Sequence, residues 1–171
     1  MVVNTDVAES LRDWLRQNCG MVQRESSLME KRNHLWYSCG LSFECLGCGN
    51  CCAGPDEGYI WIRRGEIESA AAFLKMSEGA FRKKFLRRIG LRHSIIEHPA
   101  TKDCIFLTDL GGGKRGCAIY PVRPTQCRTW PFWTENLRSP DTWNTAGLKC
   151  PGINRGPVFP IEDIEQRRTQ K

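Results

Sequence analysis

Apolar residues recur every three or four positions in three segments, and this spacing predicts three helices. The segments are residues 6–17, residues 65–75 and the residues that follow Ser77. In the third segment Phe81, Phe85 and Ile89 would form the buried face, with Ser77 as the N-cap. Gly90 stands where a helix would end. The polar residues 18–33 between the first helix and the first cysteines read as a linker.

Short apolar runs bounded by glycine predict strands elsewhere. Residues 35–37 and residues 59–62 are β-prone, and residues 105–107 and 118–120 flank a glycine-rich stretch at residues 109–113. The latter pair predicts a β-hairpin with a loose tip. The elements together indicate an α+β fold, a small single domain with about three helices and a β-hairpin.

The length and composition fit one soluble domain, preceded by a helix and linker and followed by a charged tail. The chain has 171 residues, of which 40% are hydrophobic and 26% charged. We predict an N-terminal helix and linker over residues 1–34, a cysteine-cluster metal-binding domain over residues 35–155, and a charged C-terminal tail over residues 156–171. The start lacks a signal peptide and no apolar run is long enough to span a membrane, so we expect a cytoplasmic protein without membrane contact.

Cysteine is the unusual component, with ten residues in the chain. In a reducing compartment such a density favours metal binding over disulfides. Four lie within eight positions, at Cys45, Cys48, Cys51 and Cys52, where Gly47 and Gly49 allow tight turns. Four more follow at Cys104, Cys117, Cys127 and Cys150, while Cys19 and Cys39 read as ordinary thiols. The irregular, Gly/Cys-rich domain would thus be organised by metal–thiolate sites, either one centre with spare thiols or two centres of four sulfurs.

The metal can be iron, as an iron–sulfur cluster such as 4Fe-4S, or zinc, and the crowded first run favours iron. We also expect at least one downstream cysteine to complete a centre begun by the first run. The reason is that adjacent side chains in extended backbone, such as Cys51 and Cys52, point to opposite sides. Arg123 and Arg128 lie among the downstream cysteines, where they would either bind the anionic cofactor or hold the loop through carbonyl groups.

The basic balance of the chain is a poor guide to partners. The formal charge is +6, but eight thiolates and two divalent ions would reduce it to about +2. Basic residues at positions 82–84 and 87–88 suggest a solvated helix face, because no aromatic residues interleave with them. Nucleic acid is therefore disfavoured, and the expected partner is a metal ion or cluster, with a protein partner left open.

Three cysteine motifs in the chain resemble those of the YkgJ-type cysteine-cluster family. They are Phe-x-Cys-x-x-Cys-Gly-x-Cys-Cys at residues 43–52, Cys-x-Ile-Tyr-x-x-Arg-Pro-x-x-Cys-Arg at residues 117–128 and Cys-Pro-Gly at residues 150–152. The resemblance covers roughly residues 41–153. It implies chelation of zinc or iron by all eight cysteines of the two groups. The resemblance also implies a link to protein modification, because a related module occurs beside flagellin lysine methylation. Three functions stay open: a metal-binding module, an enzyme or enzyme accessory that uses the cluster, and a zinc-stabilised nucleic-acid-binding protein.

Overall fold

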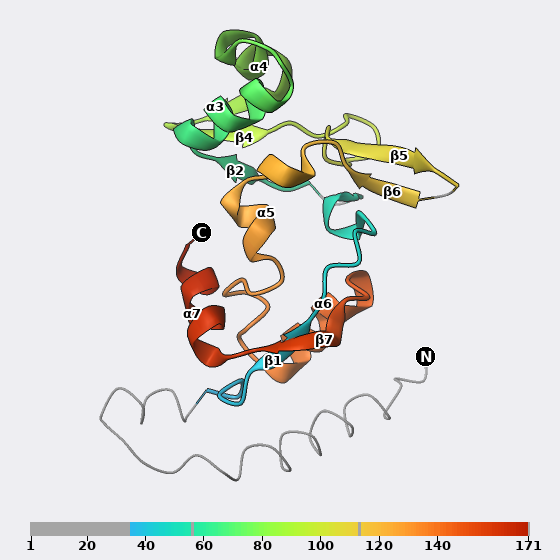
Figure 1. The fold of residues 1–171 in the computed structure, drawn as a ribbon, viewed down its shortest axis with the longest axis vertical. Coiled ribbons are helices and arrows are strands. Elements are labelled where there is room, and N and C mark those ends of the chain that lie inside the picture. Colours follow the sequence, from blue (N-terminus) through green and yellow to red (C-terminus); the bar gives the residue numbers. More distant parts are fainter. Residues whose placement is uncertain (1–34, 56, 113, 171) are drawn as a thin grey trace. The chain divides into compact units, whose positions relative to one another are not determined.

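The computed structural model describes residues 35–55, 57–112 and 114–170, and these form two compact units (Figure 1). Unit 1 contains the described residues up to Glu44 together with Pro131–Thr169. Unit 2 contains the described residues of Cys45–Trp130 together with Gln170. Seven of the eight predicted cysteine ligands therefore belong to unit 2, and Cys150 belongs to unit 1.

Unit 1 is built on a two-stranded antiparallel sheet that joins distant parts of the sequence. Strand β1 (Leu41–Phe43) pairs with β7 (Ile153–Phe159), with an irregularity in register after Ser42. Helix α6 (Pro140–Lys149) begins at Ser139, whose hydroxyl accepts a hydrogen bond from the backbone N–H of Thr142 at 3.2 Å. The Trp143 side chain of α6 is fully buried, and its ring stacks on Phe132 at 5.7 Å. Aromatic rings therefore form part of the core of unit 1.

Residues 161–169 form helix α7 (Ile161–Thr169). This differs from the expected charged tail. Ile161 and Ile164 are buried, while Glu165 accepts a hydrogen bond from the Tyr37 hydroxyl at 2.7 Å. Because the two isoleucines are three positions apart, one face of an otherwise charged segment can pack inward as a helix.

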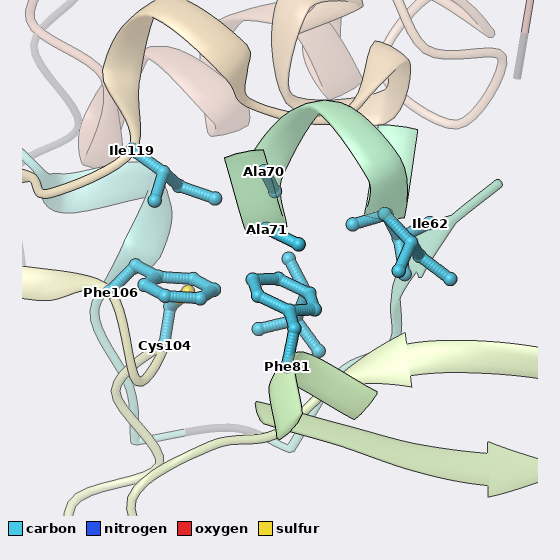
Figure 2. Close-up of a cluster of buried hydrophobic side chains, with 9 residues drawn as sticks. Ile62, Ala70, Ala71, Phe81, Cys104, Phe106 and Ile119 are labelled. Carbon is cyan, nitrogen blue, oxygen red and sulfur yellow. The ribbon is translucent and has the colours of Figure 1, made fainter. Parts of the chain in front are cut away.

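Unit 2 combines a three-stranded antiparallel sheet with two helices. The strands are β2 (Ile60–Ile62), β3 (Leu86–Ile89) and β4 (Arg92–Ile95), in the order β2-β4-β3. The helices are α3 (Arg64–Phe73) and α4 (Glu78–Phe85). They meet the sheet in a core of nine buried residues that includes Phe81, Phe106 and Cys104 (Figure 2). The Phe81 ring is fully buried and lies nearly parallel to Phe106 at 6.0 Å.

The remaining elements of unit 2 carry or flank cysteines. They are the short helix η2 (Asn50–Cys52), the hairpin of β5 (Leu107–Gly111) and β6 (Lys114–Cys117), the short helix η3 (Tyr120–Val122) and helix α5 (Thr125–Thr129). The strand at residues 60–62, the helix within residues 64–73 and the Ser77 cap of α4 confirm the corresponding sequence predictions. A hairpin is also present, but its strands lie mainly between the apolar runs at residues 105–107 and 118–120 that predicted it.

The expected number of elements is wrong, although the fold mixes helices and strands as predicted. Within its described residues the chain has five α-helices and seven strands in three small sheets, in place of about three helices and a hairpin. The expected strand at residues 35–37 is a turn, and β1 begins at Leu41. The helix predicted at residues 6–17 and the linker at 18–33 lie outside the described residues.

Helix α4 also ends earlier than its apolar spacing suggested. Residues 86–89 leave the helix and pair with β4, so Ile89 is a strand residue and Gly90 occupies the β3–β4 turn with a φ of 58°. The basic residues at 82–84 and 87–88 are consequently divided between a helix and a strand. They do not form the single helix face that the sequence suggested.

Candidate metal centre

The first cysteine run folds into tight turns, which brings two of its sulfurs together. Gly49 has a φ of 73°, and a Cβ atom at this position would lie 2.7 Å from Leu107 Cδ1, so a side chain would be both strained and crowded. The backbone N–H of Cys52 donates to the Gly49 carbonyl at 2.9 Å. In this turn the sulfurs of Cys51 and Cys52 are 3.9 Å apart. The expectation that these adjacent side chains point to opposite sides is therefore wrong, because residues 50–52 form a 3₁₀ turn and not extended backbone.

Cys104 joins the first run through both its backbone and its side chain. Its N–H donates to the Cys52 carbonyl at 2.8 Å. Its thiol is hydrogen-bonded to that of Cys52, which raises the Cys52 pKa above the ordinary thiol value. Cys104 is buried among the core residues of unit 2, so this part of the site is anchored to the core (Figure 2).

Cys117 and Cys127 lie close enough to Cys51 for their charges to interact. Burial raises the pKa of Cys127 to about 12, and the negative charges of Cys51 and Cys117 add to the effect. Burial also raises the pKa of Cys117, and the negative charge of Cys51 adds to this rise. The pKa of Cys51 is itself raised, first by its hydrogen bond to Cys52 and then by burial and by the charges of Cys52 and Cys45. Thiols that raise one another's pKa in this way are stabilised as thiolates when a cation binds among them.

Cys45 has the opposite tendency because it lies beside hydrogen-bond donors and a cation. Partial burial would raise its pKa, but the N–H of Gly47, the Tyr120 hydroxyl and the Arg123 guanidinium together hold the pKa below the ordinary thiol value. The Tyr120 hydroxyl donates to the Cys45 sulfur at 3.6 Å. The Arg123 guanidinium carbon lies 3.8 Å from the centre of the Tyr120 ring. Arg123 therefore supplies positive charge directly at the cysteines.

Arg128 is engaged mainly with the protein. Its guanidinium donates to the Arg123 carbonyl at 2.6 Å and to the Thr125 hydroxyl at 2.9 Å. It also lies 3.7 Å from a carboxylate oxygen of Glu66. These contacts match the loop-holding alternative considered from the sequence, and a cofactor contact by Arg128 stays a prediction.

Glu66 was not identified from the sequence, yet it positions the helix that carries Cys127. One of its oxygens accepts from the N–H of Thr125 at 2.7 Å and from the Thr125 hydroxyl at 2.5 Å. The other accepts from the N–H of Arg63 at 2.8 Å. Burial alone would raise the Glu66 pKa, but these hydrogen bonds and the charge of Arg128 hold it below its usual range. Glu66 thus fastens the start of α5 to the start of α3, a contact that no local pattern indicates.

Tyr120 was also missed, although a signal for it was present. It stands between Cys117 and Arg123 in the motif used for the family resemblance. A tyrosine at a fixed distance from both a cysteine and an arginine could have been read as a hydrogen-bond donor to the site.

The other cysteines are placed differently. Cys48 is partly buried in the first loop, and Cys150 is buried in unit 1, where its N–H caps α6 by donating to Ala146 at 3.0 Å. Cys39 is disulfide-bonded, so its interpretation as an ordinary thiol is wrong, and Cys19 lies outside the described residues. All eight predicted ligands carry free thiols.

The sulfur ligands are of the type that a thiophilic metal prefers, but their present arrangement matches a metal site only in part. Two thiolates on one tetrahedral ion with bonds of about 2.3 Å are separated by about 3.8 Å, and the Cys51 and Cys52 sulfurs are 3.9 Å apart. Across the described residues, however, no group of three or more His, Cys, Asp or Glu side chains is already arranged to hold one metal ion. Binding would therefore require side-chain rearrangement.

This cysteine-rich α+β site is characteristic of a metal-chelating domain, and the comparison with known families agrees. The family model CxxCxxCC, described as "Putative zinc- or iron-chelating domain", matches residues 44–151, which is more than half of the chain. The chain belongs to this family. The match contains all eight cysteines of the two predicted groups, and metal binding is the property that the family description supports.

A curated relative adds similarity without a function. The chain is 28% identical over 96 residues to a protein of Methanocaldococcus jannaschii named "Uncharacterized protein MJ0661". The match covers 56% of this chain and 48% of the relative, so the chain spans about half the length of that protein. No solved structure matches the chain. Among the helices of the described residues, none has the length and apolar character needed to cross a membrane.

Proposed function

We propose that this protein binds an iron–sulfur cluster, of the 4Fe-4S type, through cysteines of unit 2. The observation that carries the proposal is the central position of Cys51. Its thiol interacts electrostatically with those of Cys45, Cys52, Cys117 and Cys127. Cys104 is added through its hydrogen bond to Cys52. Six thiols in one connected group are more than the four that a 4Fe-4S cluster or a zinc ion takes, and their origin in several separate segments suits the larger cofactor.

The charge of the surroundings also supports a thiolate-bound cluster. Four thiolates make the cofactor site anionic, and a nearby guanidinium lowers the free energy of that charge. Arg123 meets this requirement, because its charge lowers the pKa of Cys45 and opposes the rise at Cys51 and Cys127. Cys48 remains a predicted ligand within unit 2, and Cys150 remains a predicted ligand within unit 1.

Zinc is the second candidate, and one distance favours it. The 3.9 Å between the Cys51 and Cys52 sulfurs suits two ligands of the same ion. In a four-iron cluster each cysteine binds a different iron, so adjacent ligands would have to spread apart. A zinc-binding protein would have a structural role in which the metal supplies folding free energy.

The experiment is anaerobic purification followed by iron, sulfide and zinc analysis and a visible absorption spectrum. A brown protein with iron and sulfide in equal amounts supports the cluster, whereas a colourless protein with stoichiometric zinc supports the second candidate. Cys51→Ser should lose most of the metal, while Ser69→Ala, a control at an exposed position of α3 outside the predicted ligand set, should retain it. Unchanged metal content in Cys51→Ser, or a folded wild-type protein that takes up neither metal, would contradict metal binding by this group.

A further inference from the structure

A cavity of about 380 Å³ lies in unit 2 beside the start of helix α3. Its volume is within the range of sites for small organic ligands. Part of its wall is apolar, formed by Trp61, Ile62, Ile67 and Leu91. The cavity has no part in the metal binding proposed above.

The polar wall of the cavity is strongly basic. Its cationic and titratable basic residues are Arg63, Arg64, Arg82, Arg92 and His93. Among the described residues of the wall, Glu66 is the single acidic one, and its two oxygens already accept the hydrogen bonds from Thr125 and Arg63. A cavity with four arginines and one engaged carboxylate has a positive potential, which attracts anions.

The arginines are not equally available to a ligand. Arg64 pairs with Glu68 at 3.2 Å, and Arg82 lies 3.6 Å from Glu78, so both have part of their charge balanced outside the cavity. Arg92 instead lies over the Trp61 ring, with its guanidinium carbon 4.2 Å from the ring centre. A guanidinium that stacks on an aromatic face keeps its N–H groups at its edge, where they can bind an anion in bidentate fashion.

The Trp61 side chain is held in turn by neighbours. Its ring is parallel to that of Tyr59 at 5.1 Å and 9°, and Arg87 lies 5.0 Å from the centre of the Tyr59 ring. The backbone N–H of Trp61 donates to the Gln126 side chain at 2.8 Å. The Trp61 ring thus stacks on Tyr59 and also contacts Arg92, which favours Trp61 as a rigid support for Arg92.

We propose that this cavity binds a small organic molecule that bears phosphate groups. The arginines and His93 supply donors for the phosphate oxygens, and the apolar wall accommodates the organic part. Gln126 and Thr125, which line the cavity, belong to the same helix as the predicted ligand Cys127. A bound phosphate compound would therefore lie next to the helix that supports the metal centre, as the substrate or effector of a cluster-using enzyme would.

The test is calorimetric titration of the purified protein with pyrophosphate, ADP and citrate at constant ionic strength. We expect pyrophosphate and ADP to bind with dissociation constants below about 1 mM, ADP more tightly because of its organic part, and citrate more weakly than both. Arg92→Gln should weaken pyrophosphate binding by about tenfold or more, because it removes a charge-assisted contact. His93→Gln is the second variant and should also weaken it.

Arg88→Gln is the matched control, because it makes the same change in charge. Arg88 is opposite His93 in the β3–β4 register but is exposed and does not line the cavity. Its pyrophosphate affinity should remain within about threefold of wild type. Absence of binding by both phosphate compounds, equal losses in Arg88→Gln and Arg92→Gln, or citrate binding as tight as pyrophosphate would each overturn the proposal. Metal analysis of the same samples keeps this result separate from that of the proposed function.

Discussion

Replacing Glu66 with glutamine should loosen the attachment of α5 and thereby destabilise unit 2. The Glu66 side chain is 14% exposed and accepts hydrogen bonds from the Thr125 N–H and hydroxyl and from the Arg63 N–H. Glutamine keeps one oxygen, but its amide nitrogen faces one of these donors. The loss of a charge-assisted hydrogen bond with a donor left unpaired costs about 2–3 kcal/mol.

The assay is urea unfolding followed by circular dichroism, with the metal content of each sample measured. Glu68→Gln provides the control on the same helix. Its partner Arg64 is 85% exposed and Glu68 itself 48% exposed, so this substitution should cost about 0.5 kcal/mol or less. If the two variants unfold within that margin of each other, Glu66 does not position α5 in the way described.

The pH dependence gives an independent check on Glu66. Its pKa is lower in the folded protein than in the unfolded chain, so its stabilisation is present above the unfolded value of about 4.3 and is lost as the pH falls through the folded value. The difference in unfolding midpoint between wild type and Glu66→Gln should therefore decrease below about pH 4. A difference that is the same at pH 7 and pH 3 would contradict the assignment.

Two further pairs of substitutions test the packing of unit 2 by thermal or urea unfolding. Phe81→Ala removes a fully buried ring from the core and should lower the free energy of unfolding by about 3–5 kcal/mol. Leu91→Ala changes a side chain that is 92% exposed and should lower it by less than about 0.5 kcal/mol. Similar losses of stability in the two variants would refute the described core. Gly54→Ala would place a Cβ atom 2.0 Å from the Thr101 carbonyl oxygen and should destabilise by more than about 1 kcal/mol. Gly65→Ala, where nothing lies within 4 Å, should be neutral or stabilising, and equal effects at the two glycines would show that the loop after Cys52 is not closely packed.

Local patterns predicted the elements whose formation depends on neighbouring residues. The Ser77 cap, the apolar face of α3 and the hairpin at residues 107–117 each depend on positions a few residues apart, and the structure contains all three. The end of α4 was not predicted, because the competing interaction is the pairing of residues 86–89 with β4. The strand β1 pairs with β7 more than a hundred residues later, and no short-range periodicity encodes such a pairing.

The chemistry of the site and its arrangement have different origins. Residue types and spacing in the sequence were sufficient to indicate thiolate ligation of a metal, because cysteines two residues apart in a glycine-rich loop are the usual spacing of metal ligands. Three features depend on side chains brought together from separate elements. They are the proximity of Cys51 to Cys127, the hydrogen bonds from Thr125 to Glu66, and the basic cavity that Arg92 lines. Their positions follow from the burial of apolar residues around Phe81 and from hydrogen-bond pairing across unit 2, so they could be found only in the tertiary structure.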